Sequence, residues 1–257
     1  MQPLLNIAIN AARQAGDIIL RYADQLDRIK ISEKTQNDFF SEVDIKAEQT
    51  IIQTIHKAYP DHGIIAEECG VIREDAECVW IIDPLDGTNN YLHSFPFYAV
   101  SIGIQIKNRI EHAVVYDPTR HECFSATRGR GARLNDRRLR VSKQTQLTSS
   151  MLGVSLQHKN HHPGQPSLSA IQALINHCGS VRRTGSVALE LAYVASGRLD
   201  GFFGFGLKPW DIAAGSLLIQ EAGGFVSDPQ GGEHFLTQGH IITATPKIFK
   251  PMMQALS

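Results

Sequence analysis

A short apolar run that ends in two carboxylates constrains this chain more than any other feature of its sequence. Residues 79–82 are apolar and indicate a buried strand, and the string DPLDGT follows directly at residues 83–88. Pro84 keeps the backbone extended before the turn, and Gly87 permits a close approach or a dihedral that other residues avoid. Residues 88–91 are predicted to open a short helix, whose free N–H groups favour a phosphate. The segment thus predicts a buried strand that delivers two carboxylates to an anion-binding turn.

These carboxylates indicate a metal site. Asp83 and Asp86 would repel a phosphate beside them unless a cation lay between, and hard oxygen ligands without His or Cys favour Mg²⁺ over zinc. A simple Asp-Gly turn with Asp83 as a cap is the alternative. Other carboxylates favour the metal site: Glu67 and Glu68 end the preceding strand, and Asp211 lies at the start of a later helix. Taken alone, the Glu pair is typical of a solvated turn and Asp211 of a helix N-cap.

The first half of the chain is predicted to contain two helices and a sheet. Apolar residues recur at helical spacing over residues 3–26. A second helix begins near Ser41, where Ser41 and Asp44 match a capping box, and it ends before Pro60. Apolar segments indicate strands at residues 63–66, 79–82, 100–106, 110–116 and 122–127. A hairpin turn at residues 107–108 favours an antiparallel sheet.

The pattern changes after about residue 140, where helical and strand segments alternate. Helices are predicted at residues 168–177, 186–196, 212–222 and 247–256, and strands at residues 151–156, 180–182, 199–205 and 224–227. Such alternation favours an α/β arrangement. We predict an N-terminal α+β half over residues 1–145 that carries the metal and phosphate site. A C-terminal α/β half over residues 146–257 is predicted to complete it.

The overall composition argues against several classes of protein. The 25 basic and 26 acidic residues give a net charge of -1, so no general field favours nucleic acid or a membrane. Four scattered cysteines without a CxxC pair indicate free thiols in a reducing compartment rather than a disulfide framework or a zinc site. The N-terminal residues lack a basic region, and no apolar run is long enough for a membrane span. We expect a cytoplasmic protein.

Five segments resemble the inositol monophosphatase family, and within it the bacterial SuhB-type branch. They follow the family's order: IIAEECG (64–70), WIIDPLDGTNNY (80–91), VVYDPTRHECFSATRGRGARLND (114–136), RRTGSVALELAYVASGRLDGFF (182–203) and KPWDIAAGSLLIQEAGG (208–224). The second and last blocks together are highly specific. The resemblance implies a layered α-β-α-β-α sandwich and a homodimer. It also implies a Mg²⁺-dependent phosphatase that hydrolyses myo-inositol monophosphate by means of a metal-activated water.

The same resemblance implies ligands for two or three Mg²⁺ ions. Glu67, Asp83 and the carbonyl of Leu85 would hold a first ion. Asp83, Asp86 and Asp211 would hold a second, with Asp83 as the bridge between the two.

Catalytic and substrate-binding residues are implied in the same way. Asp44 resembles the family's outer carboxylate that orients water, and Glu67 and Thr88 would orient or deprotonate the attacking water. The phosphate would be received by the turn after Asp83, and the alcohol portion of the substrate would face a later helix N-terminus. The residues expected to contact the substrate are Asp86, Gly87, Thr88, Gly185, Ser186 and Val187.

Two departures from the family pattern matter. The milder one is that the family string usually reads DGTTNF, whereas this chain has Asn89 and Tyr91. Family members commonly carry a Glu seven residues before the PWD aspartate, where it contacts inositol hydroxyls, whereas this chain has Gly204. Loss of a hydrogen bond to a hydroxyl weakens discrimination by roughly 1–3 kcal/mol. Inositol monophosphate is the leading substrate, and a sugar phosphate phosphatase of the fructose-1,6-bisphosphatase type is the alternative within the same fold.

A binding role is an alternative of a different class. Six arginines between Arg128 and Arg140 form a basic run that is typical of a solvated face, and that would also fit an acidic partner or RNA. SuhB-type members can associate with the transcription apparatus, so the resemblance allows a non-catalytic role there. His158, His161 and His162 lie in a loop with Pro and Gly, which we expect to be a solvated surface.

Overall fold

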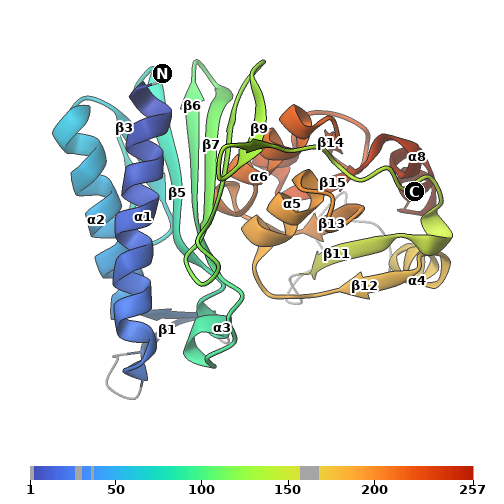
Figure 1. The fold of residues 1–257 in the computed structure, drawn as a ribbon, viewed down its shortest axis with the longest axis horizontal. Helices are drawn as coiled ribbons and strands as arrows, with labels where there is room; N and C mark the ends of the chain where they lie inside the picture. Colours follow the sequence, from blue (N-terminus) through green and yellow to red (C-terminus); the bar gives the residue numbers. More distant parts are fainter. Residues whose placement is uncertain (1–2, 27–30, 36–37, 157–167, 257) are drawn as a thin grey trace.

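Helices and sheets alternate in five layers in the computed structural model, which describes residues 3–26, 31–35, 38–156 and 168–256 (Figure 1). Two helices cover one face of the first sheet, two lie between the sheets, and two cover the outer face of the second sheet. In that order these pairs are α1 (Pro3–Ala23) and α2 (Glu42–Ala58), α5 (Val187–Ala195) and α6 (Pro209–Ala222), and α4 (Leu168–His177) and α8 (Pro246–Leu256). The layered α-β-α-β-α sandwich is confirmed.

The first sheet has eight strands in the order β10-β9-β8-β7-β6-β5-β3-β4. They are β3 (Gly63–Ala66), β4 (Gly70–Ile72), β5 (Cys78–Asp86), β6 (Ala99–Ile106), β7 (Arg109–Asp117), β8 (Glu122–Thr127), β9 (Gly131–Leu134) and β10 (Arg137–Arg138). The predicted hairpin turn lies between β6 and β7, where Lys107 (φ 49°) and Asn108 (φ 62°) are both left-handed. This is the backbone that a two-residue hairpin requires, because it matches the twist of the strands.

The prediction of an antiparallel first sheet is wrong for one pair of strands. β3 pairs with β5 in parallel, with Ala66 opposite Ile82, whereas β4 turns back along the free edge of β3. Because β4 takes the edge, the chain re-enters the sheet on the other side of β3. Parallel strands end at the same side of a sheet, so the residues that follow β3 lie beside the end of β5.

α1 packs closely on the first sheet because its buried face is made of small residues. Ala8, Ala11, Ala12 and Ala15 are fully buried, and a Cβ added at Gly16 would lie 2.6 Å from the ring of Tyr116 on β7. The helix can therefore lie against the strands over most of its length.

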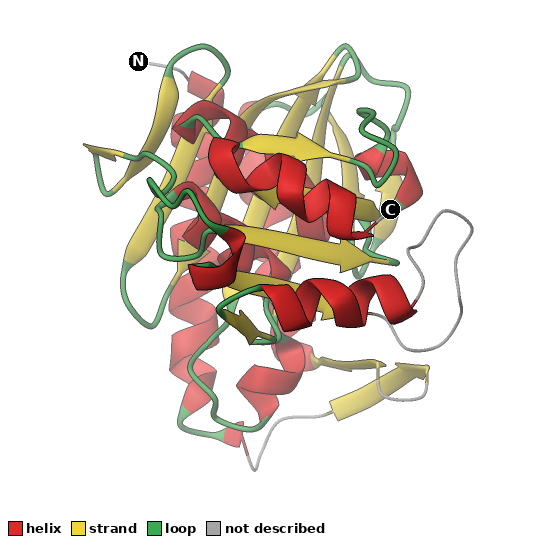
Figure 2. Cartoon of the chain, turned by 90° about the vertical axis from the view of Figure 1, so that its right-hand side faces the viewer, coloured by secondary structure: helices red, strands yellow, loops and turns green. Residues whose placement is uncertain are grey.

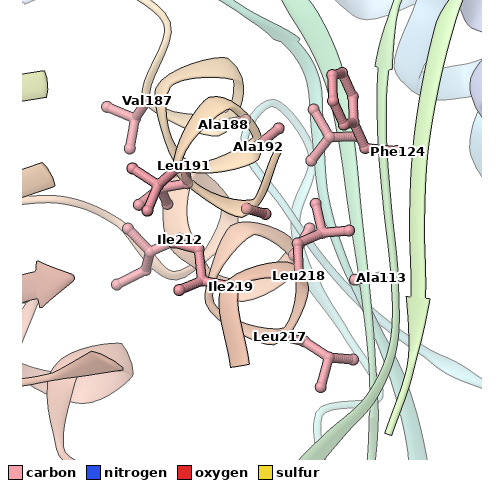
Figure 3. Close-up of a cluster of buried hydrophobic side chains, with 14 of the residues drawn as sticks. Ala113, Phe124, Val187, Ala188, Leu191, Ala192, Ile212, Leu217, Leu218 and Ile219 are labelled. Atoms are coloured by element: carbon pink, nitrogen blue, oxygen red, sulfur yellow. The ribbon is translucent and has the colours of Figure 1, made fainter. Parts of the chain in front are cut away.

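The two central helices are apolar on nearly every side because each faces a sheet on both sides. Figure 3 shows Leu217 and Leu218 of α6 pointing toward Ala113 and Phe124 on the first sheet. α5 and α6 also approach each other closely, because a Cβ at Gly215 would lie 2.4 Å from the side chain of Leu191. This rigid middle layer supports the N-terminal ends of both helices.

The second sheet has five strands in the order β12-β11-β13-β15-β14. They are β11 (Met151–Leu156), β12 (Ser180–Arg182), β13 (Gly201–Phe205), β14 (Phe225–Ser227) and β15 (His240–Ala244). The outer helices lie in front of this sheet in Figure 2. Smaller elements complete the described chain, namely β1 (Ile31–Thr35), β2 (Asp38–Ser41), α3 (Thr88–Leu92), a 3-10 turn (Leu147–Ser149) and α7 (Phe235–Gln238).

The sequence analysis missed β15, which lies between β13 and β14 and is buried along its whole length. A strand buried on both faces shows no alternation of polar and apolar residues, so the pattern that revealed the outer strands is absent. α6 begins at Pro209, earlier than the predicted residue 212, because proline suits the first turn of a helix.

Three other sequence expectations concern the surface and the thiols. Cys69, Cys78, Cys123 and Cys178 are all free, as predicted. Within the described residues, no helix is both long and apolar enough to cross a membrane. The histidine-containing loop of residues 158–162 lies outside the described residues.

Candidate metal and phosphate site

Two carboxylates meet where β3 and β5 end. Because β3 and β5 are parallel, Glu67 follows Ala66 at the level of Asp83, and the Glu67 N–H donates to the carbonyl of Ile82 at 3.2 Å. Asp83 is 2% exposed and Glu67 is half-buried. The sequence expectation that the strand-end Glu lies beside Asp83 is confirmed by this register.

A buried carboxylate of α2 holds the chain beside Glu67. Glu48 is 3% exposed, and its two oxygens accept the backbone N–H groups of Glu68 and Cys69, each at 2.8 Å. The residues that follow Glu67 are thereby fixed to α2. Sequence analysis missed Glu48, although a charged residue on the apolar face of a helix, four residues after Asp44, is a usable signal.

Replacement of Glu48 by Gln is expected to lower the free energy of unfolding by about 1–3 kcal/mol, because the new NH₂ group faces a backbone N–H that has lost its acceptor. Displacement of Glu67 should also reduce the stabilisation that Mg²⁺ gives, measured as the shift in thermal midpoint. Glu221→Gln is the matched control. Glu221 accepts the N–H groups of Gly129 and Gly131, each at 2.7 Å, and it lies away from this site. An unaltered Mg²⁺ shift in Glu48→Gln would contradict the assignment of Glu67.

The turn after Asp83 is compact and leads directly into α3. The Leu85 N–H donates to Asp83 Oδ1 at 3.0 Å. Gly87 adopts φ 103°, a left-handed conformation, and an added Cβ would lie 3.0 Å from the carbonyl oxygen of Phe97. Glycine is therefore required here both for the dihedral and for the close approach of the segment that leads into β6. α3 begins at Thr88, where the short helix was predicted.

Asp44 lies behind this turn and contacts Thr88. The predicted capping box of α2 is present, with the Ser41 N–H and hydroxyl donating to Asp44 Oδ2 at 2.8 and 2.6 Å. The Thr88 hydroxyl lies 2.8 Å from Asp44 Oδ1 and 3.1 Å from the carbonyl oxygen of Leu85. Burial raises the pKa of Asp44, and its hydrogen bonds to Ser41 and Thr88 oppose that increase.

Asp86 connects the first sheet to the N-terminus of α5. Its Oδ2 accepts the Ser186 hydroxyl at 2.7 Å and the Ala188 N–H at 2.6 Å. Burial raises the pKa of Asp86 to about 6, although these hydrogen bonds favour the ionised form. The helix N-terminus also favours a negative charge. Two segments about one hundred residues apart, both predicted to line the site, are thus brought together.

Asn90 makes a second connection between the same segments, which sequence analysis missed. Its Nδ2 donates to the carbonyls of Phe97 at 2.7 Å and Thr184 at 2.8 Å. Gly185 packs on it with φ 89°, and an added Cβ would lie 2.9 Å from both amide atoms of Asn90.

Asp211 lies in the first turn of α6, where it accepts the Lys208 N–H at 2.8 Å. Its position alone predicts an N-cap residue, but the N-cap is Lys208, and Asp211 is the third helical residue of a capping box. Burial raises its pKa well above the ordinary value, with further contributions from Asp86 and Glu67. The start of α6 is tied to β6 by the Ser101 hydroxyl, which donates to the carbonyl of Trp210 at 3.1 Å.

Negative charge is concentrated at this point. The pKa of Asp83 is raised well above its ordinary value, first by burial and then by the neighbouring charges of Glu67, Asp86 and Asp211. Across the described residues, no three His, Cys, Asp or Glu side chains are already arranged to hold a metal ion. Without a cation between them, like charges repel. Asp86 and Asp211 therefore accept backbone N–H groups at the starts of α5 and α6 rather than lying together around one point.

The donor set fits Mg²⁺. The four carboxylates and the Leu85 carbonyl are hard oxygen ligands, and neither sulfur nor imidazole is among them. Burial raises the pKa values of Asp83, Asp86 and Asp211, and neighbouring carboxylates add to the increase for Asp83 and Asp211; a shared cation would offset both effects. The side chains of Asp86 and Asp211 would need to turn toward it.

A separate hollow lies at the opposite end of β5. It has a volume of about 620 Å³ and is lined by Pro3, Leu4, Tyr59, Asp61, His62, Ala76, Glu77, Cys78 and Ile106. Its two carboxylates are paired, Asp61 with Arg73 at 3.2 Å and Glu77 with Lys107 at 3.3 Å. We place the candidate site at the other end of the strand, because the mutually repelling carboxylates lie there.

Comparisons with known proteins agree over the whole chain. A sequence profile of the inositol monophosphatase family matches residues 1–257. The Nus factor SuhB of Pseudomonas aeruginosa is 48% identical, over 100% of this chain and 96% of that protein. The extragenic suppressor protein suhB from Bartonella henselae has a similar structure, with a TM-score of 0.95 at 38% identity over 100% of this chain and 99% of that one. The inositol monophosphatase from Anabaena (Nostoc) sp. PCC 7120 has a TM-score of 0.87 at 34% identity, over 98% of this chain and 94% of that one.

Proposed function

Because this chain belongs to the inositol monophosphatase family, we propose that it is a magnesium-dependent phosphomonoesterase that hydrolyses myo-inositol monophosphate to inositol and phosphate. The observation that carries the proposal is the convergence of four carboxylates on one end of the first sheet. Glu67 follows β3 beside Asp83 at the end of β5, and Asp86 and Asp211 accept backbone N–H groups at the starts of α5 and α6. A protein maintains such a cluster at a cost in stability, so it is expected at a functional site.

In this proposal Glu67, Asp83 and the Leu85 carbonyl hold one Mg²⁺, and Asp83, Asp86 and Asp211 hold a second. A third ion is compatible with the number of oxygens. Bound Mg²⁺ would supply an acidified water and neutralise the charge on the phosphate oxygens.

Thr88 and Glu67 orient the attacking water in the proposed mechanism. When the Thr88 hydroxyl donates its proton to Asp44 at 2.8 Å, its lone pairs remain free to accept a hydrogen bond from that water. Glu67 accepts the proton that the water loses. Asp44 acts through Thr88, because it fixes the direction of the hydroxyl.

Substrate binding in this proposal uses two helix starts. The backbone of Gly87 and Thr88 receives the phosphate, together with Asp86 through the metal. The alcohol portion faces Gly185, Ser186 and Val187 at the start of α5. The hydrogen bond between Asp86 and Ser186 supports this assignment, since it sets the two segments at one site.

Gly204 offers no side chain to a hydroxyl of the alcohol. Gly204 is buried in β13, and an added Cβ would lie 2.7 Å from Leu207 and 2.9 Å from the ring of Phe202. Discrimination among polyols must come from other residues. A sugar phosphate phosphatase of the fructose-1,6-bisphosphatase type is therefore the second candidate within the same chemistry.

A binding role with the transcription apparatus is the candidate of another class. It is favoured by the name of the P. aeruginosa relative, which is called a Nus factor. Arginines 130, 133, 137, 138 and 140 around the β9–β10 hairpin are exposed and would suit an acidic partner or RNA. An Asp86→Asn protein that keeps the cellular role would separate this role from catalysis.

A substrate panel tests the proposed function. Phosphate release would be measured with myo-inositol monophosphate, β-glycerophosphate, fructose 1,6-bisphosphate, histidinol phosphate and a nucleotide 3′-phosphate, each with and without Mg²⁺. The proposal expects Mg²⁺-dependent release with the highest kcat/KM for the inositol ester. If another ester has the highest kcat/KM, the proposed substrate changes and the proposed Mg²⁺-dependent hydrolysis remains. Absence of release from every ester by folded protein would favour the binding role.

A further inference from the structure

A buried carboxyl group lies behind the turn that faces the proposed substrate, and the mechanism above does not use it. Glu190, on α5, is 1% exposed. Its Oε1 accepts the Thr184 N–H at 2.6 Å and the Thr184 hydroxyl at 2.5 Å. Among the described residues its Oε2 is one of two buried side-chain oxygens without a hydrogen-bond partner, the other being Thr243 Oγ1. Burial of a half-satisfied carboxyl group is costly and needs an explanation.

We infer that Glu190 is a positioning residue that fixes Thr184 and Gly185 against Asn90, and thereby determines how tightly the site holds the alcohol portion of a polyol phosphate. The kinetic part of this inference rests on the proposed function. The structural part does not, because it concerns contacts within the protein.

The turn is held between two side chains. On one side Thr184 donates twice to Glu190, and on the other the Thr184 carbonyl accepts from Asn90 at 2.8 Å. Gly185, between these contacts, is exposed and presses on the Asn90 amide. The exposed part of the turn is therefore held from behind by the two hydrogen bonds that Thr184 donates to Glu190.

The carboxyl group of Glu190 lies beside Gly153. A Cβ added at Gly153 of β11 would lie 3.2 Å from Oε2 and 2.9 Å from the ring of Phe202, so the strand has no room for a side chain there. Burial raises the pKa of Glu190 to about 7. The hydrogen bonds from Thr184 and the charge of Arg183 oppose that increase, and the charge of Asp86 adds to it. Because Oε1 accepts both donors of Thr184 and Oε2 has no hydrogen-bond partner, an amide that keeps Oε1 should replace the carboxyl group well.

The opposite end of the turn is held independently of Glu190. Asp86 accepts the Ser186 hydroxyl and the Ala188 N–H, and Ser186 caps α5. Loss of Glu190 should therefore loosen Thr184 and Gly185 while Asp86 keeps its place. A binding effect without a large effect on the chemical step is the expected signature.

The test compares Glu190→Leu, which keeps the volume but removes both acceptors, with Glu190→Gln, which keeps Oε1. Thr184→Val removes only the hydroxyl donor, and Glu221→Gln is a remote control of the same kind of carboxylate. KM and kcat would be measured for myo-inositol monophosphate and for para-nitrophenyl phosphate, which has no polyol. Hydrogen exchange of the segments that contain residues 183–188 and 89–97 gives a readout without substrate.

For Glu190→Leu we expect KM for the inositol ester to rise about ten-fold, kcat to change less than about three-fold, and KM for the aryl ester to stay within about two-fold. Both segments should exchange faster. Glu190→Gln should resemble the unaltered protein, and Thr184→Val should lie between. Equal exchange in Glu190→Leu, or a loss in Glu190→Gln as large as in Glu190→Leu, would overturn the inference. If the unaltered protein hydrolyses neither ester, the proposed function fails, and hydrogen exchange still decides whether Glu190 positions the turn.

Discussion

Replacement of Asp86 by Asn should abolish turnover while the fold remains intact. The Asn oxygen can accept the Ser186 hydroxyl and the Ala188 N–H that Asp86 now accepts at 2.7 and 2.6 Å, so α5 keeps its partner. The variant lacks the negative charge that a second Mg²⁺ needs, and loss of metal-based stabilisation of the transition state corresponds to roughly a thousand-fold fall in kcat/KM. Phosphate release at saturating Mg²⁺ measures it.

Two comparisons make this result specific to the charge of Asp86. Circular dichroism and the thermal midpoint of the metal-free variant should match or exceed those of the unaltered protein. Glu221→Gln, which also loses a carboxylate that accepts two backbone N–H groups, should keep its turnover. An Asp86→Asn protein with more than about a tenth of normal activity would contradict the assignment of Asp86 as a ligand.

The stability of the metal-free protein should fall as the pH rises from about 4 to about 7. Burial raises the pKa of Asp86 from 3.8 to about 6, and those of Asp83 and Asp211 are also raised. Between the unfolded and folded pKa values the folded protein binds more protons than the unfolded chain, so the free energy of unfolding decreases with pH. At about 1.4 kcal/mol per pKa unit, the raised pKa values together should lower the free energy of unfolding by roughly a few kcal/mol across this window.

Mg²⁺ should reverse this dependence, because it binds the ionised carboxylates. At about one hundred times its Kd a ligand adds about 2.7 kcal/mol, and for a chain of this size each kcal/mol raises the thermal midpoint by roughly 2–4 °C. We expect the Mg²⁺ shift, measured by calorimetry, to be small at pH 5 and largest above pH 7. Asp86→Asn should show a weaker pH dependence without metal and a smaller Mg²⁺ shift. Metal-free stability that rises over this window would show that the carboxylates are not destabilised by their burial.

The fold and the central carboxylates could be predicted because each has a local signal. Asp83 and Asp86 follow an apolar run, and the capping box at Ser41 marks the start of α2. The resemblance to a family supplied the five layers, which local patterns alone would not. The parallel pairing of β3 with β5 was not predicted, since it depends on β4 taking the sheet edge.

The residues that support the site could not be predicted in the same way. Asn90 acts on Thr184, which is 94 positions away, and that contact exists only after both halves fold. Glu48 and Glu190 do leave a trace, because each is a carboxylate on an otherwise apolar helix face. A charged residue on an apolar helix face either destabilises the fold or has a partner in the core. The sequence does not show which backbone N–H groups such a carboxylate will accept.

Hydrolysis in water enriched in the heavy oxygen isotope, with and without Mg²⁺, shows whether a metal-activated water attacks the phosphorus atom. If the carboxylate cluster supports attack of a metal-activated water on phosphorus, folded protein will release phosphate from myo-inositol monophosphate only with Mg²⁺. The heavy oxygen will then be found in the phosphate and not in the inositol. Equal release without Mg²⁺, or heavy oxygen in the inositol, would contradict the account.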